Sequence, residues 1–292
     1  HHKSRATSSA RCTNTPNSTV AMQLSINELT TYRWTFDQDV RAYRKHGVQC
    51  MSVWQDKVSD YGEEKGAELL AETDMDVATL MWAGGFTGDD GRSFQEAVED
   101  AERSIELAAL LQAKSLTVYS GARGGHTRNH ARRLFMMAIE QLLPTARTHG
   151  IELAVEVMHP NAASGWTFLT ELEMVLDLVQ RLRDPMLKMA IDLYHWGQEP
   201  HMYPLISDLV QHLSVVHIGD TYQPPTDEHE RCLLGNGIIP LELITQRLIE
   251  SGFEGPMDVK LLGQEIELTD YDEVIRSSID FTRGLFDRVA QS

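Results

Sequence analysis

An alternation of short β-rich runs and amphipathic helical stretches repeats eight times along this chain. In each unit a short apolar run is followed by a segment whose apolar residues recur at helical spacing. Neighbouring parallel strands need a crossover that is usually a helix, so eight units in series predict an α/β fold, a single (β/α)8 barrel of the TIM type. The expected strands are 23–30, 48–54, 76–84, 115–121, 151–158, 187–195, 213–220 and 257–263.

The segments between these runs have the pattern of helices that cover a sheet. The clearest are 93–113, 130–150 and 271–290, in which apolar residues line one face. Pro144 lies inside the second of these, and we expect it to kink that helix. An open doubly wound sheet is the structural alternative, but the glycine-rich loop GARGGH at 121–126 does not match its G-x-G-x-x-G phosphate fingerprint.

The barrel pattern runs without a linker or a shift in composition, so one barrel is expected over residues 22–292. Residues 1–21 are polar, basic and rich in Ser and Thr, and they lack the apolar core of a secretory signal. We expect them to form a disordered or extended tail outside the barrel, or an arm that packs on a partner subunit. We interpret His1 and His2 as the remnant of a purification tag.

The balance of charge excludes several classes of partner. The chain has 26 Lys and Arg against 43 Asp and Glu, a formal net charge of −17. Such a surface repels nucleic acid and anionic membranes, although it leaves room for a small anionic substrate in a local pocket. No apolar run reaches the length of about 18 residues that a membrane span needs. Cys12, Cys50 and Cys232 share no metal or redox spacing, so we expect a reducing compartment, the cytoplasm.

Ionisable residues gather in the last four strands, near the C-terminal ends where this fold carries its chemistry. Glu156 lies in AVEVMHP, Asp192 in AIDLYHWG, His217 in VVHIGD and Lys260 in MDVKLLG. Their apolar neighbours are expected to face the helices, so strand alternation turns all four side chains into the barrel. Carboxylates grouped there repel one another, and a divalent cation would neutralise them. Oxygen and nitrogen donors of this kind suit Mn²⁺, Mg²⁺, Zn²⁺, Co²⁺ or Fe²⁺.

The order and spacing of these segments resemble the xylose-isomerase-like TIM barrels, the superfamily of sugar phosphate isomerases and epimerases. The resemblance covers about residues 23–290 and includes the loop ERCLLGNGIIP at 230–240. It implies a small sugar-like substrate, a divalent metal, and a homo-oligomer, since related barrels often pair. The metal ligands that it implies are Glu156, Asp192 and His217. The predicted substrate-binding residues are His195, Arg231, His159, Trp54 and Asp220.

The resemblance also implies roles for individual residues of the predicted pocket. His195 would bind a substrate oxygen, and Arg231 would bind a hydroxyl, a carboxylate or a phosphate. Trp54 and Trp82, at the ends of the second and third strands, would wall the pocket.

Lys260 departs from the pattern of this superfamily, in which strand eight usually supplies a glutamate as the fourth metal ligand. A second acid of some epimerases, six residues after the strand-five glutamate, is here Ala162. Three roles for Lys260 stay open. In the first, its ammonium replaces the metal between Glu156 and Asp192. In the second, Lys260 lies beside the metal as a neutral amine that acts as a base or forms an imine. In the third, its side chain points out to solvent. Glu265 is a further candidate for the missing ligand.

These features predict an isomerase or epimerase that acts on a sugar, a sugar acid or a cyclic polyol. Glu156 or Lys260 would remove the proton next to a carbonyl, and the metal together with His195 would stabilise the enediolate. The alternative is a metal-free homologue that binds carbohydrate without turnover or acts as a lysine-dependent lyase. A third interpretation is the superfamily's DNA-repair endonuclease branch, which the negative charge opposes. Its candidate zinc ligands are His126, His130, His159 and His229.

Overall fold

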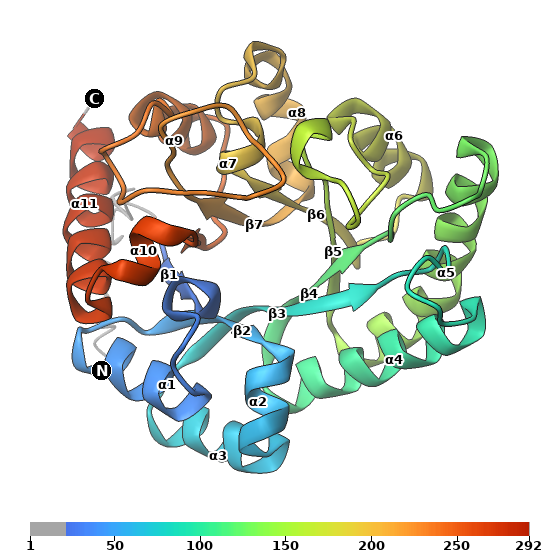
Figure 1. The fold of residues 1–292 in the computed structure, drawn as a ribbon, viewed down its shortest axis with the longest axis horizontal. Helices are drawn as coiled ribbons and strands as arrows, with labels where there is room; N and C mark the ends of the chain where they lie inside the picture. Colours follow the sequence, from blue (N-terminus) through green and yellow to red (C-terminus); the bar gives the residue numbers. More distant parts are fainter. Residues whose placement is uncertain (1–21, 292) are drawn as a thin grey trace, which may run out of the picture.

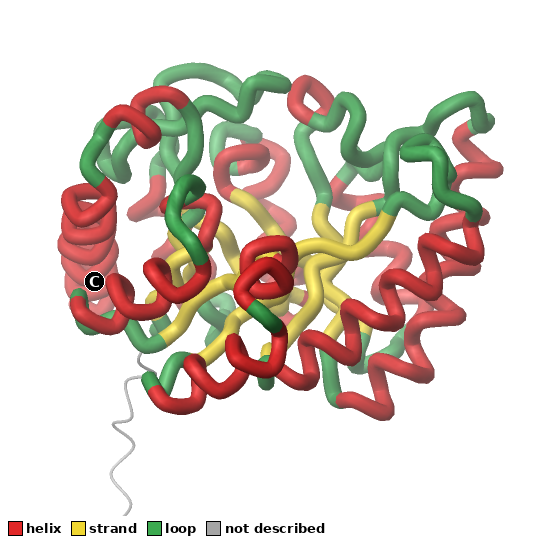
Figure 2. Tube along the Cα trace, turned by 60° about the horizontal axis from the view of Figure 1, so that its bottom comes forward, coloured by secondary structure: helices red, strands yellow, loops and turns green. Residues whose placement is uncertain are grey.

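The computed structural model describes residues 22–291, and these form a closed barrel of eight parallel strands that pair in chain order. Strands occupy the centre of the molecule and helices surround them (Figure 1), as the turned view also shows (Figure 2). The strands are β1 Leu24–Asn27, β2 Cys50–Trp54, β3 Asp76–Gly84, β4 Ala113–Tyr119, β5 Glu152–Glu156, β6 Leu187–Asp192, β7 Leu213–Ile218 and β8 Met257–Val259. The predicted (β/α)8 barrel is confirmed. The tail predicted over residues 1–21 lies outside the described residues.

Helices follow the strands as the alternation predicted, and short turns of helix extend several loops. The longer ones are α1 Phe36–Lys45, α2 Gln55–Tyr61, α3 Glu63–Glu72, α4 Phe94–Leu110, α5 Arg128–His149, α6 Leu172–Leu182, α9 Leu241–Glu250 and α11 Tyr271–Gln291. The short ones are η1 Glu28–Thr31, η2 Pro160–Ala162, α7 Leu193–Trp196, η3 Pro200–Leu205, α8 Ile206–Leu209, η4 Val210–His212 and α10 Gln264–Leu268. Pro144 lies within α5, which continues on both sides of it as one helix. No helix of residues 22–291 has the length and hydropathy of a membrane span.

Several strands end earlier than the sequence predicted, because polar side chains cap the turns that follow. Asp192 ends β6 and accepts a hydrogen bond from the Tyr194 backbone N–H at 3.0 Å, which starts α7. Asn27 ends β1 and caps η1 by accepting from the Leu29 N–H at 3.1 Å. As a result, His195 lies on the short helix α7 rather than on a strand, and Lys260 lies directly after β8.

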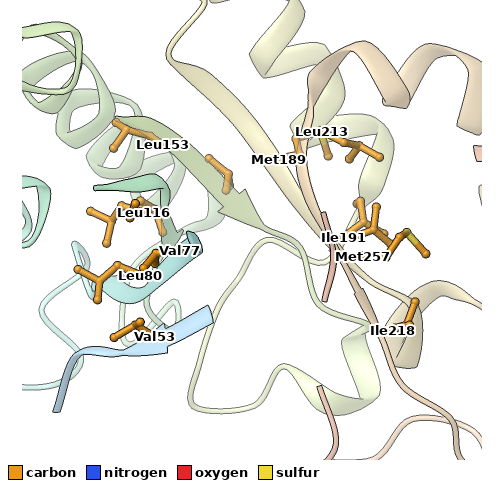
Figure 3. Packing of buried hydrophobic residues seen from close by; sticks show 14 of the residues in the cluster. Val53, Val77, Leu80, Leu116, Leu153, Met189, Ile191, Leu213, Ile218 and Met257 are labelled. Carbon is orange, nitrogen blue, oxygen red and sulfur yellow. The ribbon is translucent and has the colours of Figure 1, made fainter. Parts of the chain in front are cut away.

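The outer face of the barrel packs against the helices and supplies the main hydrophobic core. Leu80, Leu116 and Leu153 occupy paired positions on β3, β4 and β5, and Figure 3 shows them with the other strand residues of this core. Ile105 of α4 and Ile139 of α5 belong to the same buried cluster. Burial of these side chains, at roughly 25 cal/mol per Å² of apolar surface, holds the helical layer on the sheet.

The interior of the barrel is small and polar by comparison. Its apolar side chains include a small cluster of Ala154, Ala190 and Val215 that is separate from the main core. Asp258 of β8 accepts hydrogen bonds from Ser25 Oγ at 2.6 Å and Asn27 Nδ2 at 2.9 Å. Small side chains leave space in which longer polar residues can lie, so the interior can accommodate buried charges near its C-terminal end.

A second group of buried charges lies where β1 meets α1 and α2. Lys57 Nζ donates to Asp39 Oδ2 at 2.7 Å and to the Thr31 carbonyl at 2.9 Å. Glu28 is fully buried beside them, and its Oε2 accepts from the Trp54 N–H at 2.6 Å. Burial, together with the Asp39 carboxylate, raises the pKa of Glu28 well above its ordinary value. This cluster has two acids for one lysine, so a proton on Glu28 balances its charge.

Candidate active site at the C-terminal end of the barrel

Lys260 lies at the centre of a buried ion-pair cluster at the C-terminal end of the barrel. Its Nζ donates to Glu156 Oε1 at 3.0 Å and lies 3.2 Å from Asp192 Oδ2. All three side chains are almost wholly shielded from solvent. The hypothesis that Lys260 points out to solvent is therefore wrong. Its strand alternation with Val259 and Leu261 places it inside, where two carboxylates compensate its charge.

Arg231 completes the cluster from the loop between β7 and α9. Its guanidinium donates to Asp192 Oδ2 at 2.9 Å and to Asp192 Oδ1 at 3.3 Å. It also donates to the Lys260 carbonyl at 2.7 Å and lies 4.5 Å above the ring of Tyr194. Protein groups thus use both terminal nitrogens of Arg231, although the sequence suggested that it would bind substrate. It fixes the orientation of Asp192 through a two-point contact.

Electrostatics within the cluster keep all of these groups charged. Burial alone would raise the pKa of Asp192, but Arg231 and Lys260 outweigh it and hold that pKa well below its ordinary value. Burial would also raise the pKa of Glu156, but the positive charge of Lys260 outweighs this effect and lowers that pKa. For Lys260, burial favours the neutral amine, yet Glu156 and Asp192 raise its pKa. In this resting site Lys260 is an ammonium, not the neutral amine that a base or an imine-forming residue would need.

Two histidines near the cluster are neutral at physiological pH. Burial lowers the pKa of His195 to about 3 and that of His229 to about 4. His217 is held by Asp258, whose Oδ2 is 2.7 Å from His217 Nδ1. Three buried atoms of this region have no hydrogen-bond partner within residues 22–291: His195 Nδ1, His217 Nε2 and Arg231 Nε. Buried polar atoms are rarely left unpaired, so these indicate positions where a ligand or water binds.

A cleft of about 90 Å³, partly open to solvent, lies over the ion-pair cluster. Glu156, Lys260, Arg231, His195 and His229 supply its polar surface. Its remaining walls are apolar or aromatic: Leu29, Trp82, Tyr119, Met158, Trp166 and Leu262. An apolar cleft with a few convergent polar groups is the usual form of a small-molecule site.

The structure does not bring every predicted site residue to this cleft. Trp54 lies in a neighbouring groove, where its ring stacks on Tyr32 at 5.3 Å. His159 pairs with Glu199 at 3.2 Å, and neither lines the cleft. Trp82 does line it, whereas Tyr119 and Trp166 were not predicted. Loop conformation decides which aromatic side chain reaches the cleft, and strand alternation carries no information about loops.

Asp220 also lies away from the cleft, and its carboxylate organises the loop that carries Arg231. Its Oδ2 accepts from the backbone N–H groups of Gly235 and Gly237 at 3.0 and 3.1 Å. Its Oδ1 accepts from the Ile239 N–H at 3.1 Å. A Cβ added at Gly237 would lie 2.1 Å from Asp220 Oδ1, so only glycine fits here. Asp220 is placed to support the site and not to contact a substrate.

Replacing Asp220 by alanine is expected to destabilise the protein by about 2–4 kcal/mol, because it leaves the backbone N–H groups of four residues without their acceptor, namely those of Thr221, Gly235, Gly237 and Ile239. Urea unfolding measures the change. Asp220→Asn keeps one acceptor oxygen and serves as the matched control, with a smaller expected loss. Equal stability of the alanine variant and the wild type would show that water replaces the carboxylate at no cost.

The arrangement of donors does not fit a divalent metal at the predicted ligands. No group of three or more His, Cys, Asp or Glu in residues 22–291 is arranged to hold a metal ion. Glu156 and Asp192 direct oxygen atoms at the Lys260 ammonium instead. A dication bound to the same oxygens would lie against that ammonium and be repelled by it. Glu265, the other candidate ligand, accepts hydrogen bonds from Tyr222 and the Leu233 N–H outside the cluster.

The histidines considered for a nuclease site do not converge either. The rings of His126 and His130 lie 4.8 Å apart, and His126 Nε2 is 2.9 Å from the Thr87 carbonyl. Of the four candidates, only His229 lines the cleft. The described residues therefore lack the zinc cluster on which that interpretation depended.

The fold and the site together define a TIM barrel whose polar residues converge under a cleft at the C-terminal ends of the strands. Residues 40–285 match the family model described as xylose isomerase-like TIM barrel. The chain belongs to this family, as the sequence motifs indicated. No curated protein matches the chain.

Solved structures with the same fold include proteins of several descriptions. Protein SMc04130 from Sinorhizobium meliloti 1021 has a TM-score of 0.84 and 28% sequence identity, covering 90% of this chain and 98% of its own. A structure described as IolI protein with a binding zinc atom has a TM-score of 0.81 at 19% identity, covering 92% and 99%. A D-psicose 3-epimerase with D-tagatose, from Clostridium cellulolyticum H10, has a TM-score of 0.74 at 11% identity, covering 90% and 99%. At such low identity the last two show the shared fold alone.

Proposed function

We propose that this protein is a metal-independent isomerase or epimerase for a sugar-like hydroxycarbonyl compound, in which the Lys260 ammonium takes the place of the metal. One observation carries the proposal: the buried Lys260 Nζ lies 3.0 Å from Glu156 and 3.2 Å from Asp192, at the floor of the cleft. A fixed cation of this kind stabilises negative charge that develops on a substrate oxygen. The family and its sugar epimerase neighbours support the substrate class.

The proposed reaction is a proton transfer at the carbon next to a carbonyl. The Glu156 carboxylate removes that proton, and the electron pair of the C–H bond forms a carbon–carbon double bond. The carbonyl π pair moves to oxygen, giving an enediolate that accepts hydrogen bonds from the Lys260 ammonium. Return of the proton from Glu156 to the neighbouring carbon gives an isomer. An epimer forms when a water molecule protonates the original carbon on its opposite face and regains a proton from Glu156 through solvent. His195, neutral and with an unpaired Nδ1, carries a proton between the two substrate oxygens during isomerisation.

A second candidate is a carbohydrate-binding protein without turnover. The ion pair that holds Lys260 also lowers the pKa of Glu156, which weakens that carboxylate as a base. Solvent-deuterium incorporation separates the two functions. Exchange of the hydrogen next to the carbonyl of a bound sugar, in metal-free protein, indicates catalysis. Binding without exchange in every sugar tested indicates a binding protein.

Metal content tests the role of Lys260 directly. In protein without His1 and His2, we expect the wild type to carry substoichiometric metal, and Lys260→Glu to bind a divalent ion near stoichiometrically. The substitution replaces the ammonium by a carboxylate, which adds a fourth donor to Glu156, Asp192 and His217. Mass spectrometry after incubation with Mn²⁺ or Zn²⁺ and desalting measures both. Lys65→Glu makes the same charge change at an exposed position of α3 and is the control. A near-stoichiometric metal in the wild type would overturn the proposal.

A further inference from the structure

We infer that the cleft binds an uncharged polyhydroxylated ring, such as a free sugar or a cyclic polyol ketone, and rejects sugar phosphates and sugar acids. This inference rests on the proposed function and narrows its substrate class. It depends on the balance of charge at the cleft floor and on the chemistry of the cleft walls.

The charged groups at the floor of the cleft already neutralise one another. Lys260 and Arg231 supply two positive charges, and Glu156 and Asp192 supply two negative charges within 3.3 Å of them. Lys260 and Arg231 are the only Lys or Arg among those of residues 22–291 that line the cleft. His195 and His229 contribute no charge at neutral pH, because burial lowers the pKa of each to about 3 and about 4, respectively. The cleft therefore offers no surplus positive charge to an anionic substrate.

The remaining hydrogen-bonding capacity suits hydroxyl groups. Recognition of a phosphate or carboxylate usually needs several charge-assisted donors in a fork. The terminal nitrogens of Arg231 are used by Asp192 and by the Lys260 carbonyl, which leaves its Nε without a partner. His195 Nδ1 is a second wholly buried atom of the described cleft-lining residues that has no hydrogen-bond partner. Single, separate donors and acceptors of this kind pair with hydroxyls, each of which both donates and accepts.

The walls of the cleft add an apolar surface above this polar floor. Trp166 contacts both Trp82 and Tyr119, with ring centroids 6.0 and 6.3 Å apart. Met158 and Leu262 extend the apolar surface. A charged group facing these walls would lose its water without gaining a partner. The C–H face of a sugar or cyclitol ring can lie against aromatic rings while its hydroxyls reach the floor.

Isothermal titration calorimetry on matched pairs of compounds tests the inference. The probes are free ketohexoses, aldohexoses and keto-inositols, each beside its monophosphate or its uronic acid. We expect at least one free compound to bind about tenfold or more tightly than its charged counterpart. Trp166→Ala, at an exposed position of the wall, is expected to weaken binding of that compound and confirms that it occupies the cleft. Tighter binding of a phosphate or acid than of its neutral partner would overturn the inference.

A second variant tests the balance of charge itself. Glu156→Gln removes one negative charge with little change in shape and leaves the cluster with a surplus positive charge. We expect this variant to gain binding of inorganic phosphate that the wild type lacks, with Glu64→Gln on the exposed face of α3 as the control. Phosphate binding by the wild type, or its absence in Glu156→Gln, contradicts the inference. A neutral sugar that binds without deuterium exchange would instead refute the proposed catalysis and leave the inferred ligand class standing.

Discussion

Lys260→Met is expected to lower the free energy of unfolding by about 3–5 kcal/mol at pH 8 and to abolish turnover. Methionine fills a similar volume but leaves Glu156 without the ammonium that lies 3.0 Å away. Asp192 keeps Arg231 as a partner, so the uncompensated charge falls mainly on Glu156. Removal of one partner of a buried ion pair costs more than the pair itself contributes, because the other charge stays desolvated.

The pH dependence of that loss identifies its cause. In the wild type, the lowered pKa values of Glu156 and Asp192 contribute stability above the ordinary carboxyl pKa, and it is lost as the pH falls through their folded values. The raised pKa of Lys260 contributes stability below the ordinary lysine pKa, and it is lost as the pH rises through the folded value. In Lys260→Met, Glu156 can take up a proton on acidification, so the difference from wild type should shrink at pH 5. Denaturant unfolding at both pH values measures it, and a loss independent of pH would indicate poor packing of methionine instead.

Lys57→Met is expected to destabilise the protein by a similar amount, about 3–5 kcal/mol at pH 8, without contact with the cleft. The substitution removes the ammonium that lies 2.7 Å from the fully buried Asp39 and donates to the Glu28 and Thr31 carbonyls. Burial raises the pKa of Asp39 even with the lysine present. Without it, the native protein must either keep an uncompensated carboxylate or bind a further proton.

The sign of the pH effect follows from those raised values. An acid whose pKa is higher in the folded protein contributes stability at low pH and loses it as the pH rises through the folded value. The loss in Lys57→Met should therefore be larger at pH 8 than at pH 5. Glu28→Gln is the matched control, because its amide resembles the protonated Glu28 and should preserve or increase stability at pH 8. A large loss in Glu28→Gln would mean that the native cluster needs an ionised Glu28.

Strand alternation predicted which ionisable side chains turn into the barrel, and the same rule applies to one further residue. It turned Glu156, Asp192, His217 and Lys260 inward, and the structure places them there, buried. The same rule points Asp258, two residues before Lys260, into the barrel. Asp258 was not among the predicted site residues, although its Oδ2 lies 2.7 Å from His217 Nδ1 and holds that ring in place. The signal was present in the sequence, since residues i and i+2 of a strand share one face.

The sequence by itself determined the barrel, the order of its strands and the set of charges inside it, because these depend on local periodicity and on the rule that parallel strands need crossovers. Only the tertiary structure decided how those charges pair. Arg231 approaches Asp192 across 39 positions of the chain, and Lys260 approaches Glu156 across 104. Which cation meets which carboxylate depends on distances of a few ångströms between loop and strand, because Coulomb energy and desolvation change steeply over that range. Periodicity does not encode such distances, and so the pairing of the Lys260 ammonium with Glu156 and Asp192 became visible only in the folded molecule.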